Sequence, residues 1–316
     1  MTGATGFVGG ALLARLVSDG IPVTAAVRHE APEIAGTRTV HVADLGPTTD
    51  WRAALDDCRA VVHCAARVHV MHGGGVDPLA DYRVANVEGT LALARQAAAA
   101  GARRFVFISS IKVNGDGTPP GHPFRASDRP QPVDPYGISK LEAERALQEF
   151  AATGALELTI IRPPLVYGPG VKANFLSMAR WIARGVPLPL GSITANRRSF
   201  VALANLVDLI TRCLQRDEAI GQVFLVSDGE DLSTAELLRR TAKALCVAPL
   251  LLPVPESLLS FGARLLRRHE LWQRLGGTLQ VDSTPTRERL GWYPPVSVDE
   301  GLRLAVEGLR RVGATP

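Results

Sequence analysis

The sequence predicts an α/β fold: a doubly wound parallel sheet with a smaller, interleaved C-terminal lobe. Two observations predict it. Short apolar runs rich in β-branched residues alternate with helical patterns over the first two thirds of the chain, and proline and glycine punctuate the stretch after Gly168. Strands that alternate with helices form parallel sheets covered on both faces. The 316 residues suffice for one large domain or two smaller ones.

Each element follows from a local pattern. Strands are expected at the apolar, β-branched runs, residues 22–27, 39–42, 60–63, 104–108, 156–161 and 222–226. Helices are expected at residues 9–19, 51–55, 82–100 and 136–152. Gly101 and Gly154 stand where glycine commonly ends a helix. Beyond Leu232 we expect helices with proline breaks.

These patterns divide the chain into two parts. A Rossmann-type domain comprises residues 1–168, and residues 201–230 are expected to return to its sheet. Residues 169–316 form mainly the second, substrate-binding lobe, with a loop-rich insert at its start.

Composition excludes several classes of protein. Hydrophobic residues make up 46% and charged residues 21%, as in ordinary globular enzymes. The net charge of +4 is spread without a basic run, which argues against nucleic acid. We expect reduced, buried thiols and no metal, because no CxxC pair or metal-ligand spacing includes Cys58, Cys64, Cys213 or Cys246.

The sequence shows no signal-peptide pattern and no apolar run of about 18 residues, so we expect a cytoplasmic protein without a membrane span. The leucine-rich stretch at 249–266 is interrupted by prolines and charges. We favour packing in the core for it. The alternative is a surface helix that binds a membrane, with Arg264, Arg267 and Arg268 on its polar side.

The chain opens with a glycine-rich loop at residues 2–9. Gly3, Gly6 and Gly9 permit a tight turn and close approach to a pyrophosphate, and the helix that starts near Phe7 points its N–H groups at that anion. Ala65 and Ala66 follow a predicted strand and are small enough to let a dinucleotide pass. The alternative is a glycine-rich loop without a ligand.

The end of the strand at 22–27 bears on the choice of dinucleotide. An acid there would bond the adenosine ribose, whereas an arginine suits a 2′-phosphate. Arg28 stands there, and no acid precedes Glu30, which favours NADP over NAD. Alternatively, Arg28 stacks on adenine or faces solvent. Asp44 follows the next strand and either bonds the adenine amine or is an ordinary loop acid.

A Ser/Tyr/Lys set predicts proton transfer to a ketone oxygen. Lys140 lies one helical turn after Tyr136, so both share a face, and Ser110 follows an apolar strand. A free tyrosine has a pKa of about 10. We expect the ammonium of Lys140 and an oxidised nicotinamide to lower the pKa of Tyr136. Ser110 would donate a hydrogen bond to the substrate oxygen, and Lys140 would hold the nicotinamide ribose.

These residues resemble the extended short-chain dehydrogenase/reductase family, in its NAD-dependent epimerase/dehydratase group. The motifs that carry the resemblance are TGATGFVGG (2–10), VVHCAA (61–66), NVEGT (86–90), FISSIKVNG (107–115), DPYGISK (134–140), IRPPLVYGPG (161–170) and LGWYP (290–294). Their order is specific for the family and much less so for the substrate. SSIKVNG looks like a bacterial polysaccharide-biosynthesis subgroup of 4-epimerases and 4-keto-sugar reductases.

The resemblance implies roles for particular residues. Ser110, Tyr136 and Lys140 would be catalytic. The expected cofactor contacts are Gly3, Thr5, Gly6, Phe7, Val8, Gly9, Arg28, Asp44, Leu45, Ala65, Ala66, Asn86, Tyr136 and Lys140. Besides Ser110, a nucleotide-diphosphate-sugar would contact Asn174, Arg198 and Arg287, with Arg197 competing for the role of Arg198. An exposed helix arginine is the alternative for Arg287.

Departures from the family pattern narrow the reaction. Sugar 4,6-dehydratases carry an Asp-Glu pair where this chain has Ile111 and Lys112, which disfavours dehydration. Many epimerases carry a tyrosine where Asn114 stands. We therefore favour an NADP-dependent reductase of a UDP-linked 4-keto-6-deoxy-hexose. The alternatives are a UDP-glucose-type 4-epimerase, a reductase of a small ketone similar to the dihydroflavonol enzymes, and a non-catalytic cofactor-binding module.

The resemblance also implies a homodimer. Family members pair through two helices per subunit, which here correspond to residues 81–100 and 136–152. Alanine is frequent in both segments and permits close approach, although it is also a good helix former.

A first testable expectation concerns the start of the chain. A dinucleotide loop normally follows a central strand, and here Met1 lies directly against the loop. We expect that the start is assigned too late, truncation being the alternative, and that this form is poorly stable. Restoring upstream residues should raise the melting temperature, and an unchanged value would contradict the expectation.

Overall fold

The computed structural model describes residues 1–29, 36–68, 77–171, 173–266 and 268–311, with the backbone alone for 173, 174, 269–271, 310 and 311. Its main sheet is wholly parallel. One half pairs β1 (Val23–Val27) with β2 (Thr37–His41). The other half runs in the order β3 (Ala60–His63), β4 (Arg104–Ile108), β5 (Glu157–Arg162) and β8 (Gln222–Leu225).

Met1 and Thr2 join the two halves of the sheet. Thr2 forms parallel bridges with Ala26 of β1 and His63 of β3. Its backbone N–H donates to the Val62 carbonyl at 3.0 Å, and the Ala26 N–H donates to the Met1 carbonyl at 2.9 Å. The strands therefore lie in the order β2, β1, Thr2, β3, β4, β5, β8, which confirms the predicted Rossmann-type fold.

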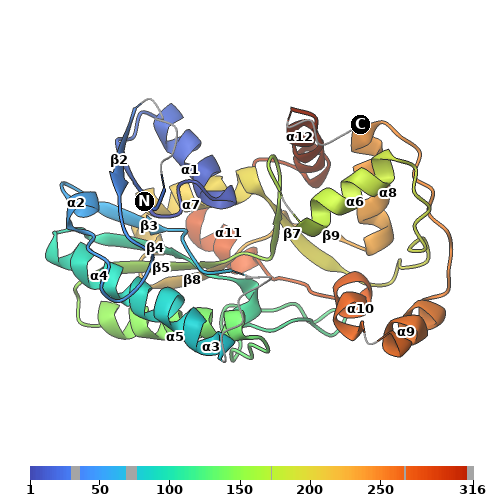
Figure 1. The fold of residues 1–316 in the computed structure, drawn as a ribbon, viewed down its shortest axis with the longest axis horizontal. Helices are drawn as coiled ribbons and strands as arrows, with labels where there is room; N and C mark the ends of the chain where they lie inside the picture. The colour runs from blue at the N-terminus through green and yellow to red at the C-terminus, as the bar shows by residue number, and fades with distance from the viewer. Residues whose placement is uncertain (30–35, 69–76, 172, 267, 312–316) are drawn as a thin grey trace.

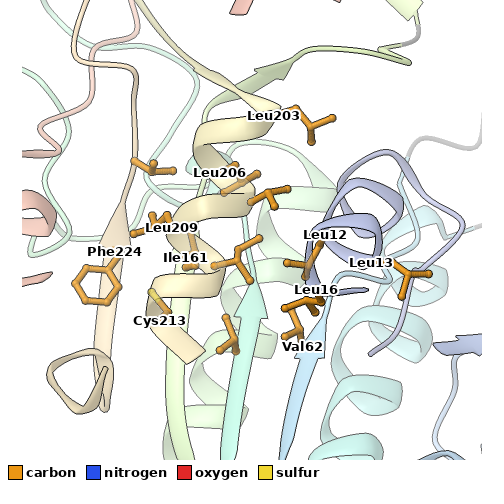
Figure 2. Packing of buried hydrophobic residues seen from close by; sticks show 14 of the residues in the cluster. Leu12, Leu13, Leu16, Val62, Ile161, Leu203, Leu206, Leu209, Cys213 and Phe224 are labelled. Atoms are coloured by element: carbon orange, nitrogen blue, oxygen red, sulfur yellow. The ribbon is translucent and has the colours of Figure 1, made fainter. Parts of the chain in front are cut away.

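Helices cover both faces of this sheet (Figure 1). On one face, α1 (Phe7–Ser18) packs against α7 (Leu203–Gln215). Figure 2 shows Leu12 and Leu16 of α1 and Leu206 and Leu209 of α7 gathered over the strands that carry Val62, Ile161 and Phe224. The other face holds α2 (Arg52–Leu55), α4 (Thr90–Ala99) and α5 (Pro135–Ala151). Alternating strands and helices each bury one apolar face, which explains why the sequence pattern predicted this architecture.

A continuous helical path leads into α4. It runs from α3 (Pro78–Arg83) through a π-helical turn, η1 (Val84–Gly89), in place of the uninterrupted helix predicted at 82–100. Gly89 ends the turn where the backbone approaches Gly46, since a Cβ on Gly89 would lie 2.8 Å from the Gly46 nitrogen. Two 3₁₀ turns, η2 (Ile111–Val113) and η3 (Asp217–Ala219), follow β4 and α7.

A second sheet lies beside the first. Parallel strands β6 (Leu165–Tyr167) and β7 (Arg198–Ala202) are extended by β9 (Asp231–Leu232), which is antiparallel to β7. Around it lie α6 (Ala173–Ala183), α8 (Thr234–Leu245), α9 (Glu256–Leu265), α10 (His269–Gly276) and α12 (Val298–Arg311). These helices and the second sheet are called the C-terminal lobe below. The remaining helix, α11 (Thr284–Leu290), packs against β8 and η3.

Three expectations for this region need correction. The stretch after Gly168 is loop-rich at 184–197 as expected, but it first forms α6, where Phe175, Ala179 and Ile182 recur at helical spacing and bury one face. Helix α9 has no buried residue and is not part of the core. Of the four thiols expected to be buried, only Cys213 is; Cys246 is exposed at the end of α8, and Cys58 and Cys64 are half-buried. No helix in the described ranges is long and apolar enough to cross a membrane.

Candidate active site

The glycine-rich loop lies between the ends of β1 and β3. Gly3 has φ of +70°, and a Cβ there would lie 2.8 Å from the Ala65 nitrogen. A Cβ on Gly9 would lie 2.0 Å from the Gly3 carbonyl oxygen. Gly6 caps α1, no side chain bonds its first turn, and that turn has no acidic residue. The N–H groups of Phe7, Val8 and Gly9 thus belong to a helix start suited to an anion, and the loop fits a pyrophosphate.

Arg28 and Asp44 lie together at the rim of the sheet. Arg28 follows β1 directly, and its Nη1 is 3.0 Å from Oδ1 of Asp44 beyond β2. Both side chains are exposed, so the pair contributes little to stability. Leu45 packs toward Gly89, while Thr5 is exposed at the tip of the glycine loop. The structure therefore places these residues along the same edge as the loop.

Ser110, Tyr136 and Lys140 come from two elements that touch. Ser110 follows β4 and caps η2, whereas Tyr136 and Lys140 belong to the first turns of α5. The Asp134 carboxylate caps α5 by accepting the Gly137 N–H at 2.6 Å. A Cβ on Gly137 would lie 2.8 Å from the Lys112 carbonyl oxygen. Glycine at this position lets the segment after Ser110 cross the start of α5.

Asn86 connects this cluster to the loop after β3. It lies in the π-helical turn and is buried. Its Oδ1 accepts the Arg67 N–H at 2.7 Å, and its Nδ2 donates to Ser139 Oγ at 3.0 Å. Ala65 and Ala66 immediately precede Arg67, so Asn86 fixes their loop against α5. π-Helical turns are frequent at functional sites.

Lys140 is buried beneath the cluster. Its Nζ donates to the Ile108 carbonyl at 2.7 Å and lies 3.9 Å from the centre of the Phe107 ring. Burial lowers the pKa of Lys140 to about 7, against the opposing effect of Glu144. Among the described contacts, none is a hydrogen bond between Lys140 and the Tyr136 phenol.

The pKa of Tyr136 differs from the sequence-based expectation. Burial, then the charge of Asp134, then Tyr82 raise the pKa of Tyr136 to about 12. The Tyr82 ring meets the Tyr136 ring edge-on, with 6.2 Å between centroids. Lys140 is not among the groups that shift the pKa of Tyr136, and its Nζ donates to the Ile108 carbonyl. The protein's own groups therefore keep the phenol protonated.

Lys112, which stands where sugar dehydratases carry an acidic residue, has a structural role here. It makes a hydrogen bond to Asp116, and its Nζ lies 3.2 Å from the second Asp134 carboxylate oxygen. It thereby ties η2 to the start of α5. Neighbouring Ile111 is buried. Neither residue supplies the carboxylate that elimination of water would need.

The adjacent residues Arg197 and Arg198 have different surroundings. Arg198 starts β7, and its Nη1 donates to the Gly277 carbonyl at 3.1 Å. Burial lowers the pKa of Arg198, opposed by Asp116. Arg197 instead donates to the carbonyls of Thr194 and Asn196. Arg198 is thus the guanidinium without a carboxylate partner among the described salt bridges, while Arg197 lies 3.7 Å from Glu236.

Arg287 lies on α11 and is half-buried rather than exposed. Its Nε is buried without a hydrogen-bond partner among the described atoms. Its guanidinium packs over Gly229, where a Cβ would lie 2.2 Å from Nη2. The side chain of Asn174, the other expected substrate contact, lies outside the described residues.

Comparison with known proteins identifies the family. The model of the NAD dependent epimerase/dehydratase family matches residues 1–227. The chain belongs to this family. Like its relatives, this epimerase/dehydratase family member is an enzyme.

Three similar proteins indicate the range of the family. A Vibrio cholerae UDP-glucose 4-epimerase is 49% identical over 305 residues, covering 96% of this chain and 92% of the relative. A Pseudomonas aeruginosa GDP-6-deoxy-D-mannose reductase is 30% identical over 253 residues, covering 77% and 78%. The solved structure of MoeE5 in complex with UDP-glucuronic acid and NAD is 27% identical, with a TM-score of 0.77 and 98% of both chains covered.

A buried polar network lies behind the site, and the sequence pattern did not predict it. Arg162 of β5 donates from Nε to Glu144 of α5 at 2.9 Å and from Nη2 at 2.5 Å. Ser109 also donates to Glu144, and Asn114 accepts from Arg162 Nη1 at 3.0 Å. All four side chains are buried. Glu144 lies one turn after Lys140 on α5, and this spacing is the one feature of the sequence that could have pointed to Glu144.

The network also explains the role of the asparagine at position 114. Its Oδ1 accepts from Arg162 while its Nδ2 donates to the Arg125 carbonyl at 3.0 Å. Asn114 is therefore a buried link between β5 and the segment beyond η2. His63 has a similar linking role, because its ring bonds Thr2 at 2.6 Å and Thr90 at 2.9 Å. Burial lowers the pKa of His63 to about 3, so the ring is neutral.

We predict that Glu144→Gln lowers the free energy of unfolding by about 3 kcal/mol, because it leaves the Arg162 cation buried without a counter-charge. Denaturant unfolding measures this change. The matched control is Glu142→Gln on the same helix, which removes an exposed pair with Arg83 and should cost less than about 1 kcal/mol. Equal losses for the two variants would contradict the prediction.

Proposed function

We propose that this chain is a UDP-sugar 4-epimerase. The observation that carries the proposal is its 49% identity to a UDP-glucose 4-epimerase across 96% of the chain, combined with an intact Ser110, Tyr136 and Lys140 set. The reductase favoured on sequence grounds becomes the second candidate. A dehydratase is disfavoured, because Ile111 and Lys112 replace the acidic pair.

The glycine loop would hold a nicotinamide dinucleotide. Gly3 and Gly9 leave the backbone open, and the uncapped start of α1 offers N–H groups to the pyrophosphate. Asn86 would lie near the nicotinamide. When bound, the nicotinamide supplies a reversible acceptor for the hydrogen at C4 of the sugar, and its oxidised ring adds a positive charge.

Tyr136 would carry the proton of the C4 hydroxyl. Epimerisation requires that this proton leaves and returns, while Ser110 donates a hydrogen bond to the same oxygen. Burial and Asp134 raise the pKa of Tyr136 to about 12, and the positive charge of an oxidised nicotinamide would lower it again. Proton removal would therefore be coupled to occupation of the dinucleotide site.

The diphosphate would be held by Arg198 of β7 and Arg287 of α11. Arg198 has no carboxylate partner in the described salt bridges, and Arg287 has a buried, unpaired N–H. A guanidinium donates two parallel N–H groups, which suits phosphate oxygens. The half-buried position of both arginines favours a ligand contact over an ordinary surface role. We also propose a homodimer through the helices at 81–100 and 136–152.

The decisive experiment is incubation of the protein with UDP-galactose and no added reductant. We expect UDP-glucose to accumulate to equilibrium, measured by anion-exchange chromatography. Tyr136→Phe should lower the rate by about 10²- to 10⁴-fold, because the C4 proton loses its carrier. Tyr293→Phe, an exposed tyrosine, serves as the control. Full activity of Tyr136→Phe would contradict the assignment.

The second candidate is a reductase of a UDP-linked 4-keto-6-deoxy-hexose. Arg28 and the 30% identity to a GDP-6-deoxy-D-mannose reductase favour it. A 4-keto substrate incubated with NADPH and with NADH distinguishes the two functions. Stoichiometric consumption of NADPH, without interconversion of UDP-sugars, would establish the reductase and overturn the epimerase.

Dinucleotide preference forms a separate prediction. We propose that Arg28 binds the 2′-phosphate of NADP. Arg28→Ala should weaken NADPH binding about tenfold and leave NADH binding nearly unchanged, as measured by fluorescence titration. Arg38→Ala, which also removes an exposed ion pair, is the control. Equal losses for NADPH and NADH would show that Arg28 does not read the 2′-phosphate.

A further inference from the structure

Large apolar side chains are exposed mainly in one region. Among the described residues, most of those that face solvent come from α6 and the turn after it, from the link between α8 and α9, and from α9 and its C-terminal end. They are Trp181, Val186, Val247, Leu250, Leu252, Leu258, Phe261, Leu265 and Leu266. Figure 1 shows these elements at one end of the molecule, away from the main sheet. A concentration of this kind indicates an interaction surface.

The apolar residues of α9 form a single stripe. Leu258, Phe261 and Leu265 are 59%, 63% and 74% exposed. They stand at positions i, i+3 and i+7, which share one face of a helix. Leu266 continues the stripe beyond the last turn and is also exposed. An ordinary surface helix directs such a stripe to the core, and α9 directs it to solvent.

Cationic residues lie beside this stripe. Arg264 lies on α9, three residues after Phe261, and Arg268 lies just beyond the end of α9, where α10 begins; both are exposed. Neither forms a salt bridge with a described side chain. Glu256, the acid of α9, is at the other end of the helix in its first turn. The exposed face therefore combines apolar and positively charged groups.

We propose that α9 binds the surface of an anionic membrane. An apolar stripe bordered by arginines is the pattern of a helix that lies in the plane of the bilayer interface. Leu258, Phe261 and Leu265 would enter the acyl boundary, and Arg264 and Arg268 would meet the lipid phosphates. Ten residues are too few to cross a bilayer, so α9 lies on it.

Charge separates this occupant from a second copy of the chain. In a twofold symmetric contact the same patch of both copies is buried in one interface, so Arg264 and Arg268 of both copies would be gathered there. Like charges in contact oppose association, whereas anionic lipid headgroups neutralise both arginines. The stripe with its arginines thus suits lipid better than self-association.

The docking surface adjoins the candidate diphosphate site. Helix α9 packs against α10. Arg198 donates to the Gly277 carbonyl directly after α10 and lies 3.5 Å from the Gln273 carbonyl. Binding through α9 would hold this part of the C-terminal lobe near the membrane surface. The inference rests on α9 alone and does not depend on which sugar the enzyme accepts.

The test is co-sedimentation of the full chain with phosphatidylcholine vesicles that contain phosphatidylglycerol, compared with pure phosphatidylcholine vesicles. We expect binding to the anionic vesicles that weakens at high salt. The double variant Arg264→Glu/Arg268→Glu should lower partitioning at least roughly twentyfold. Phe261→Ser/Leu265→Ser should also abolish binding. Leu165→Ser/Tyr293→Ser removes exposed apolar residues elsewhere and should bind as the unmodified chain does.

Melting temperatures show whether each variant folds. If Phe261→Ser/Leu265→Ser does not fold, Arg264→Glu/Arg268→Glu still tests the proposal. Failure of the unmodified chain to sediment with anionic vesicles would overturn the proposal. Equal binding of the arginine variant and the unmodified chain would overturn it as well. The proposal would also be overturned if the unmodified chain formed a concentration-dependent dimer, lost in Phe261→Ser/Leu265→Ser, and did not bind vesicles. Each result is independent of UDP-sugar turnover, so failure here leaves the proposed epimerase intact.

Discussion

Glu144 and Arg162 meet inside the protein, where neither side chain contacts water, and the geometry of the candidate site depends on this pair. Glu144 belongs to the helix that carries Tyr136 and Lys140, and Arg162 belongs to a central strand. A buried cation and a buried carboxylate are each costly alone, so any arrangement that separates the helix from the strand here leaves a buried charge without its partner. Ser109 bonds the same carboxylate, which places Ser110 relative to α5.

Close backbone contacts impose a second constraint on the site. Gly3 faces the Ala65 backbone, Gly9 faces the Gly3 carbonyl, and Gly137 faces the Lys112 carbonyl. Any side chain at these positions would push apart the loop, the strand end and the helix that the proposed reaction needs together. Both the glycine loop proposed to bind the dinucleotide and the proton-transfer cluster therefore depend on glycines, because a side chain at these positions would not fit. Asn86 links them with hydrogen bonds to Arg67 and Ser139.

The electrostatics of the cluster favour a resting state in which the phenol is protonated. Burial and Asp134 raise the pKa of Tyr136, while the buried Lys140 ammonium is directed to a backbone carbonyl. In the proposed epimerase, a positive charge brought by the bound dinucleotide would favour removal of the proton from Tyr136. Arg198 of the C-terminal lobe and Arg287 of α11 would bind the diphosphate. The outer helix of the lobe, α9, carries the apolar and cationic surface proposed to bind lipid.

The sequence by itself determined the parallel sheet, the order of its strands with their helices, the glycine loop and the Ser110, Tyr136 and Lys140 motif. These are local patterns, because periodicity and glycine spacing depend only on near neighbours in the chain. Tertiary structure alone decided the Glu144–Arg162 pair, the role of Asn114 as a link and the direction of the Lys140 ammonium. It also decided that the stripe of α9 faces outward, which leucine content alone could not distinguish from core packing. Burial and pairing arise between residues distant in sequence, so no local pattern encodes them.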